Sequence, residues 1–164
     1  MYPFPDVAKA TPPAGPAASK SGTWTLPGLC GEARVTTAFG ELPVKALRRL
    51  DPVRTASGSF LPVRWVDAVH LDDDFLSGFP DAQPISVPAG ALGRGRPQVD
   101  LLVSPHQKLA SSESSFRPEF RMARDFLSRP GILRRPRTSV SYYLFHLGEP
   151  ASVMVEGVWI PVIP

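Results

Sequence analysis

Proline is the residue type that most restricts how this chain can fold. The sequence holds 20 prolines and 13 glycines among its 164 residues. Proline removes a backbone donor and ends helices, whereas glycine adopts turn conformations at no steric cost. Aromatic and β-branched residues, which favour strands, are spread along the chain between these breaks. The sequence therefore predicts many short strands and turns and no long helix.

The chain is long enough for one domain with a proper core. Residues 1–22 are rich in proline, alanine, glycine and serine, and they show neither a helical nor a strand period. We therefore expect a disordered or extended tail over residues 1–22 and one folded domain over residues 23–164.

Alternation of apolar side chains predicts where the strands lie. The longest candidate is residues 60–71, in which Leu61, Val63 and Trp65 fall on one side and are expected in the core. Shorter strands are expected at residues 85–87, 99–103 and 158–162, and two hairpins at residues 34–44 and 140–155.

One short helix is expected over residues 120–127. Phe120, Ala123 and Leu127 form a single apolar stripe at helical spacing. The acidic run Asp72–Asp74 follows the longest strand and is expected to be a solvated turn, because it lacks the spacing and the glycine of a calcium loop.

Charge and cysteine content exclude several classes of protein. The net charge of +3 and the pI near 9.4 fall short of a nucleic-acid-binding signature. The single cysteine excludes an internal disulfide. No stretch is apolar enough to span a bilayer, and no secretion signal is visible, so we expect a cytoplasmic protein with no membrane partner.

Cys30 and His106 are the candidate reactive residues. A thiol becomes a nucleophile when its pKa is lowered or a base lies beside it, and the chain offers His70, His106 and His146 as bases. His106 follows a Ser-Pro break at a predicted strand end, where a proton-transfer role would suit it. The alternatives are a small buried hydrophobe for Cys30 and an ordinary loop histidine for His106.

No metal or cofactor site is expected. The histidines and the single cysteine do not form a zinc pattern. The glycine-rich segment Leu92–Arg96 lacks the Lys-Ser/Thr pair of a phosphate loop, and we expect it to be a turn. His70 and His146 are expected to be packing or rim residues.

An arginine-rich region is the remaining candidate for binding. It comprises residues 133–138 together with Arg117, Arg121, Arg124 and Arg129, interleaved with Phe116, Phe120 and Phe126. Binding of an anion or a nucleic acid is one interpretation. The other is a solvated face with the phenylalanines in the core.

Three segments, in order, resemble Hint (Hedgehog/intein) domains of the bacterial stand-alone type. The first runs from Arg34 to Thr55 as Thr-x-x-Gly-x-x-x-Val-x-x-Leu-x-x-x-Asp-x-Val-x-Thr, followed by Pro62-Val-Arg-Trp65. The second is the middle block, residues 87–106, and the third is residues 123–127 with the closing hairpin through Trp159. The resemblance implies an all-β disk of curved antiparallel strands with one short helix.

The resemblance also implies a self-directed reaction and the positions that would perform it. In the family, the first Cys or Ser attacks its own preceding carbonyl, and a histidine of the middle block assists. Here the nucleophile position falls on Gly28, with Cys30 two residues downstream, and the histidine position falls on Gln107, with His106 one place early. Two further positions where the family often has histidine fall on Leu144 and Pro150.

These departures favour a Hint module that has lost the family reaction and has a binding or structural role, with partner and oligomeric state unassigned. The alternative is an active autoprocessing domain that uses Cys30 with His106. A third hypothesis is binding of an anion or a nucleic acid through the arginine-rich region. Only a short segment precedes Cys30, so we expect any cleavage to free only a short peptide.

Overall fold

The computed structural model describes residues 23–112 and 119–164, so the tail predicted over residues 1–22 lies outside the described residues. The described chain forms two six-stranded sheets and a separate two-stranded ribbon. Every strand pairing named among these residues is antiparallel. The predicted fold class, all-β with one short α-helix, is confirmed.

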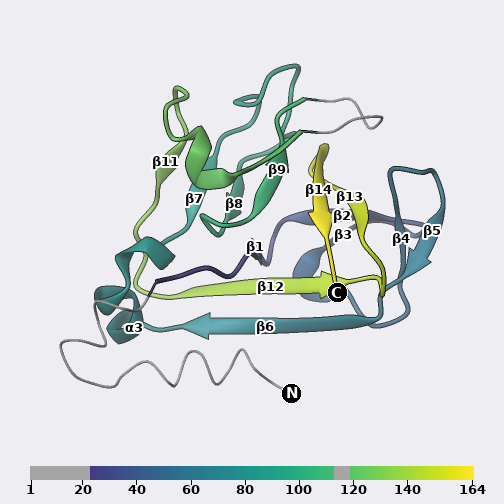
Figure 1. The fold of residues 1–164 in the computed structure, drawn as a ribbon, viewed down its shortest axis with the longest axis horizontal. Helices are drawn as coiled ribbons and strands as arrows, with labels where there is room; N and C mark the ends of the chain where they lie inside the picture. The colour runs from purple at the N-terminus through teal and green to yellow at the C-terminus, as the bar shows by residue number, and fades with distance from the viewer. Residues whose placement is uncertain (1–22, 113–118) are drawn as a thin grey trace.

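The first sheet is built around two seven-residue strands that run side by side along one edge of the molecule (Figure 1). They pair over their full length, from Val140 opposite Leu71 to His146 opposite Trp65. In spatial order the strands are β11 (Leu133–Arg134), β7 (Ile85–Val87), β8 (Leu101–Val103), β1 (Leu29–Cys30), β12 (Val140–His146) and β6 (Trp65–Leu71).

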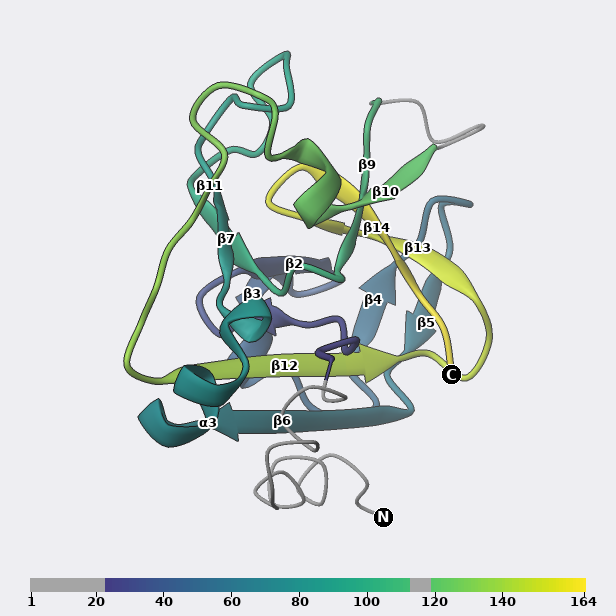
Figure 2. The same ribbon diagram turned by 60° about the vertical axis from the view of Figure 1, so that its left-hand side comes forward.

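In Figure 2 the second sheet and the ribbon lie above the paired strands β6 and β12. The sheet has the order β14 (Val158–Val162), β13 (Ala151–Val155), β2 (Arg34–Thr37), β4 (Pro52–Arg54) and β5 (Phe60–Pro62), with β3 (Gly40–Pro43) paired to β2. The ribbon pairs β9 (Lys108–Ala110) with β10 (Phe120–Met122). Three 3-10 turns complete the described elements: η1 (Val44–Ala46), η2 (Pro80–Ala82) and η3 (Ala123–Phe126).

Two apolar cores hold these elements together. The larger core takes buried residues from both sheets, among them Leu29, Val53, Val103, Phe126 and Ile160. The smaller core lies at the α3 end of β6 and β12 and contains Trp24, Val69, Leu71, Leu76, Ala82, Val140 and Tyr142. Tyr142 is fully buried, and its hydroxyl donates to the carbonyl of Ala82 at 2.7 Å.

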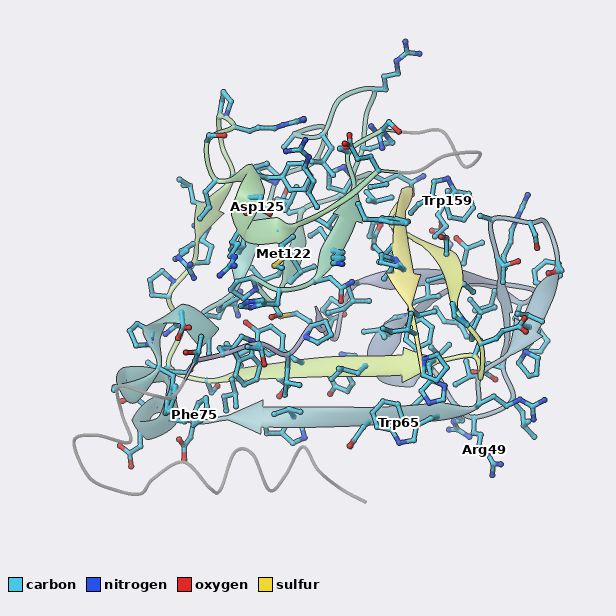
Figure 3. All side chains as sticks on the ribbon, viewed as in Figure 1. Arg49, Trp65, Phe75, Met122, Asp125 and Trp159 are labelled. Carbon is cyan, nitrogen blue, oxygen red and sulfur yellow. The ribbon has the colours of Figure 1, made fainter. Side chains whose placement is uncertain are left out.

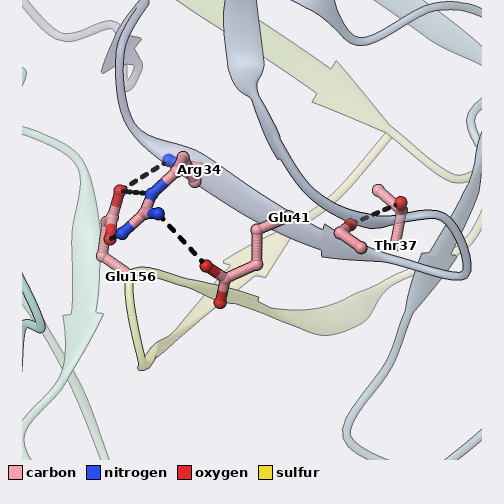
Figure 4. Close-up of polar contacts among 5 residues, drawn as sticks. Arg34, Thr37, Glu41 and Glu156 are labelled. Carbon is pink, nitrogen blue, oxygen red and sulfur yellow. Dashed lines mark hydrogen bonds and ion pairs between the residues drawn. The ribbon is translucent and has the colours of Figure 1, made fainter.

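An ion pair fastens β2 to the turn between β13 and β14 (Figure 4). Glu156 is 1% exposed, and its carboxylate accepts three bonds from Arg34: one from the backbone N at 3.0 Å, and one each from Nε and Nη2 at 2.9 Å. The hydrogen bond and the charge of Glu156 raise the pKa of the Arg34 guanidinium. Glu41 lies 3.5 Å away on the other side.

The short α-helix lies elsewhere than the sequence predicted. It is α3 (Asp73–Gly78), in the acidic segment that was expected to be a turn. Asp72 is the N-cap, because its carboxylate accepts from the Phe75 N at 2.9 Å. Asp73 and Asp74 then fall in the first helical turn, where negative side chains oppose the helix dipole.

The helix predicted over residues 120–127 is absent. Residues 120–122 form strand β10, because Phe120 pairs with Ala110 and Met122 with Lys108. Residues 123–126 form the 3-10 turn η3, and the Ala123 N donates to the carbonyl of Gln107 at 2.9 Å. Figure 3 shows Met122 and Asp125 on this segment. Pairing with β9 thus overrides the apolar stripe that suggested a helix.

The strand predicted over residues 60–71 is two strands. β5 ends at Pro62 and β6 begins at Trp65. Val63 is fully buried as predicted, and Leu61 packs against the larger core. The prediction that Trp65 lies in the core is wrong, because Trp65 is only half-buried at the outer end of β6 (Figure 3).

The two predicted hairpins fare differently. The first is confirmed, since β2 and β3 pair from Arg34 opposite Pro43 to Thr37 opposite Gly40. In the second, both strands exist but do not pair with each other. β12 pairs with β1 and β6, whereas β13 pairs with β14 and β2, so the intervening turn carries the chain from one sheet to the other.

Candidate functional site

Gly28 lies just before β1, and the loop after β8 binds both of its backbone polar groups. The Gly28 N donates to Oε1 of Gln107 at 3.0 Å, and the Ser104 N donates to the Gly28 carbonyl at 2.9 Å. Gln107 is 6% exposed, and its Nε2 donates to the carbonyl of Lys108 at 3.1 Å. Gly28 and Gln107, the two residues on which the resemblance places the family's nucleophile and histidine, are thus hydrogen-bonded to each other.

Ser104 fixes this loop against the chain that enters β1. Its Oγ accepts from the Trp24 indole nitrogen at 2.9 Å and donates to the carbonyl of Leu26 at 2.6 Å. Ser104 is fully buried, and its carbonyl accepts from the Gln107 N at 2.9 Å. A buried hydroxyl with donor and acceptor both satisfied makes a rigid joint between residues 24–28 and the middle block.

The backbone conformation of Gly28 leaves no room for a side chain. Its φ is +152°, and a Cβ built on this backbone would lie 2.7 Å from the Cβ of Tyr142. Tyr142 cannot give way easily, because it is fully buried in the smaller core and bonded through its hydroxyl. A cysteine or serine at position 28 therefore requires the backbone itself to move.

Cys30 lies on β1 opposite Tyr142 and packs, partly buried, against the smaller core. Burial raises the pKa of its thiol to about 12, a rise that the positive charge of Arg137 opposes. At pH 7 a thiol with such a pKa is thiolate in roughly one molecule in 100,000. The environment of Cys30 is therefore that of an unreactive cysteine.

His106 lies on the loop after β8 but does not bond to Cys30. Its backbone N donates to Oγ of Ser104 at 3.3 Å, while its ring Nδ1 is buried and has no hydrogen-bond partner among residues 23–112 and 119–164. Burial, and then the positive charge of Arg124, lower the pKa of His106. The charges that act on the ring are those of Asp81, Arg124, Asp125 and Arg134. The structure thus brings together Gly28 and Gln107, and not Cys30 and His106.

A groove of about 390 Å³ opens beside Gly28. Its lining is mostly apolar and comes from the residues before β1, the ends of β6 and β12, and the end of β14; it includes Pro27, Leu29, Trp65, Gln107, Leu144, His146 and Ile160. The groove is lined by residues at the ends of β12 and β14, two ends that lie side by side in Figure 1. Of the two further family positions, Leu144 lines the groove, whereas Pro150 is exposed in the following turn.

Sequence reasoning missed the Trp65–His146 pair. The two rings stack with centroids 5.4 Å apart and an interplanar angle of 17°. The Gly148 N donates to Nδ1 of His146 at 3.1 Å, which fixes the ring at the groove rim. The expectation that His146 is a rim residue is confirmed. Only the register of β6 on β12, which sequence patterns do not give, would have shown its partner.

The arginine-rich region is divided by the fold. Arg117 and Phe116 lie outside the described residues, and Phe126 is buried in the larger core. Arg121 lies 3.8 Å from Glu119, and Arg129 lies over the Phe126 ring at 5.1 Å from its centroid.

Among residues 23–112 and 119–164, no group of three or more His, Cys, Asp or Glu side chains is arranged to hold a metal ion. Within the same ranges, no helix has both the length and the apolar character needed to cross a membrane.

Comparison with known proteins agrees with this architecture. A family model described as Hint domain matches residues 27–161. Among solved structures, the fold is similar to that of a GSH-linked, splice-inactive variant of the AceL NrdHF class 3 split intein, with 14% identity and a TM-score of 0.51 over 82% of this chain and 95% of that one.

Two further inteins are similar at the same level. The gp41-1 intein has 8% identity and a TM-score of 0.50, over 85% of this chain and 99% of that one. The Msm DnaB1 intein splicing domain bound with zinc has 12% identity and a TM-score of 0.50, over 83% and 99%. These identities show a shared fold alone, and no curated protein matches the chain. Since the Hint model spans residues 27–161, most of the chain, this protein belongs to the Hint domain family.

Proposed function

We propose that this protein is a Hint module that does not cleave itself and that uses the family site to hold a peptide rather than to attack it. The observation that carries this proposal is the geometry of Gly28. The nucleophile position has no side chain, and a Cβ there would lie 2.7 Å from the Cβ of Tyr142. The family reaction begins with attack by a side-chain sulfur or oxygen at this position, and glycine has neither atom.

Gln107 supports the same conclusion from the other side of the peptide bond. Cleavage before Gly28 needs a proton on the departing Gly28 nitrogen. The N–H of Gly28 requires an acceptor, so the Gln107 atom that faces it is the amide oxygen. An amide oxygen has no proton to give near neutral pH. The contact therefore holds the Pro27–Gly28 peptide in place without activating it.

Cys30 and His106 do not replace the missing pair. Burial keeps the Cys30 thiol protonated, because it raises the pKa to about 12. The ring of His106 experiences the charges of Arg124 and Asp81 rather than the thiol. An attack by Cys30 on its own preceding carbonyl would also break the Leu29–Cys30 bond inside β1, where both residues are paired to β12.

A binding role is supported by the surroundings of residues 26–28, whose backbone is hydrogen-bonded by Ser104 and Gln107. Ser104 and Gln107 already bind the backbone of residues 26–28, and the apolar groove beside them adds the stacked rings of Trp65 and His146. Backbone hydrogen bonds beside an apolar, aromatic groove are how many domains bind extended peptide segments.

Intact mass of the purified chain tests the proposal. Full-length protein is incubated with a strong thiol reductant, and separately with hydroxylamine, which intercepts esters and thioesters. We expect the intact mass to persist in both, and Cys30→Ala to behave identically. Release of residues 1–29 that is stimulated by thiol and abolished by Cys30→Ala would instead establish the autoprocessing alternative.

A further inference from the structure

A second groove opens in the first sheet where β1 ends. Leu29 pairs with both Val103 of β8 and Tyr143 of β12, but the ladder stops at Cys30 and the chain turns away at residues 31–32. Beyond that point β1 no longer separates β8 from β12. The space lies between residues 101–102 and residues 140–141 and encloses about 590 Å³, within the range of small-ligand sites.

Positive charge remains unpaired at the rim of this groove. Lys45, Arg135 and Arg137 line it, as do Glu32 and Asp100. Glu32 is paired with Lys45, and Asp100 accepts from a backbone amide at 2.9 Å. Within the described chain, neither Arg135 nor Arg137 has a hydrogen bond or ion pair on its guanidinium group. Two guanidinium groups at one groove, neither paired with a carboxylate of the described residues, indicate a site for an anion.

The backbone that carries the two arginines is fixed independently of their side chains. The Gln83 side chain binds both backbone polar groups of Arg137. Its Nε2 donates to the Arg137 carbonyl at 2.9 Å, and its Oε1 accepts from the Arg137 backbone N at 2.8 Å. The Arg135 N donates to the carbonyl of Pro84 at 2.9 Å. This segment is the long connection from β11 to β12 in Figure 2. Because these bonds go to the backbone, both guanidinium groups are available to a ligand.

The rest of the lining suits a ligand with an apolar body. Val99, Leu102 and Tyr143 supply apolar surface, and Ser86 and Ser139 add hydroxyls. Cys30 forms part of the wall, and because burial raises its pKa to about 12 it stays neutral and does not repel an anion. The lining thus combines positive and hydroxyl-bearing side chains with apolar ones.

We propose that this groove binds a small organic phosphate monoester. Its phosphate lies between the guanidinium groups of Arg135 and Arg137, and its apolar body lies against Leu102 and Tyr143. Guanidinium groups match phosphate oxygens bidentately, which favours phosphate over a monovalent anion. Neither Gly28 nor Gln107 lines this groove, so ligand binding here is measured independently of the intact-mass test for self-cleavage.

Titration calorimetry with phenyl phosphate tests the site on the full chain. We expect saturable binding that Arg135→Gln and Arg137→Gln each weaken about tenfold or more, the loss of one charge-assisted contact. The matched control is Arg54→Gln, an exposed arginine on β4 in the other sheet, which should leave the affinity unchanged. Benzyl alcohol, which lacks the charge, should not compete. Inorganic phosphate should bind more weakly than the ester, because it lacks the apolar body.

Gln83→Ala separates a built site from general attraction to positive charge. This variant keeps both arginines but removes the two bonds that fix Arg137, so it should also weaken phenyl phosphate binding. Any of the following results overturns the proposal: no binding by the folded wild-type chain, an equal loss in Arg54→Gln, or no loss in Gln83→Ala. Binding of a single-stranded oligonucleotide that depends on Arg135 and Arg137, without binding of phenyl phosphate, would assign the surface to nucleic acid instead.

Discussion

At the scale of single residues, the proposed loss of the family reaction depends on Gly28 and Tyr142 together. Gly28 adopts a φ of +152°, and the fully buried Tyr142 occupies the space that a Cβ would need. The positive φ disfavours any L-residue at position 28 through backbone strain, and Tyr142 disfavours a side chain there through overpacking. Two glycine substitutions measure them separately.

Gly28→Ala should destabilise the fold more than Gly40→Ala. Gly40 also has a positive φ, +103°, but a Cβ there would meet nothing within 4 Å. The control variant therefore measures backbone strain alone, whereas Gly28→Ala adds overpacking against Tyr142, which typically costs about 1–3 kcal/mol. Urea denaturation of both variants gives the difference. Equal losses would mean that the smaller core accommodates a side chain at position 28.

His106 should make stability depend on pH. Burial and Arg124 lower its pKa from the ordinary value of 6.5, so the folded chain binds a proton on this ring less readily than the unfolded chain does. The corresponding stability is present above pH 6.5 and is lost as the pH falls through the folded pKa. His106→Asn should flatten the loss seen by denaturation between about pH 7 and pH 5. His70→Asn, at an exposed histidine, is the control variant. If His106→Asn lost stability with falling pH as steeply as the wild type, His106 would not be the source of the pH dependence.

At the scale of elements, the sequence predicted the strands better than their partners. The segments at residues 34–44, 85–87 and 158–162 become strands because alternation and turn residues act locally. The predicted helix at residues 120–127 fails because β9 offers Phe120 a pairing partner, which no local pattern shows. The helix at Asp73–Gly78 was missed because its capping signal, Asp72 followed by two acidic residues, was interpreted only as a turn.

The end of β6 illustrates how register decides burial. Trp65 shares its face with the buried Val69, yet at the strand end it borders the groove and stacks on His146. Trp65→Ala should therefore cost well under the 3–5 kcal/mol expected for a core aromatic, about 1–2 kcal/mol. Trp24→Ala is the comparison, because Trp24 is 2% exposed and bonded to Ser104, and it should show the full loss of about 3–5 kcal/mol. Equal losses would place Trp65 in the core after all.

The Arg34–Glu156 pair should contribute more stability than its neighbour at Glu41. Glu156→Gln removes the charge from a buried carboxylate that accepts three bonds from Arg34, and we expect a loss of about 1–3 kcal/mol. Glu41→Gln affects an ion pair with both partners more than a third exposed, and should cost less than about 1 kcal/mol. Thermal denaturation of the two variants is the measurement. A larger loss in Glu41→Gln would show that β2 is not held by the hairpin turn.

At the scale of the whole molecule, the family site depends on segments far apart in the sequence. The resemblance to Hint domains assigns the family's reactive positions to residues 28 and 107, which remains a prediction. It did not predict that Tyr142 fills the space beside Gly28, since this requires the register of β1 on β12. Nor did it predict the groove at Arg135 and Arg137, which exists because β1 is shorter than its neighbours. Sequence motifs can indicate which residues matter, whereas the grooves depend on which strands pair and in what register.

The central claim is that the backbone at position 28, and not only the absence of two side chains, makes the site unreactive. The double variant Gly28→Cys with Gln107→His restores both side chains that the family reaction uses. Its intact mass is followed in a thiol reductant, with near-UV circular dichroism to select conditions in which the chain is folded. We predict that the folded variant keeps its full mass, because Tyr142 excludes the cysteine from the position of attack. Release of residues 1–27 from the folded double variant would contradict the claim.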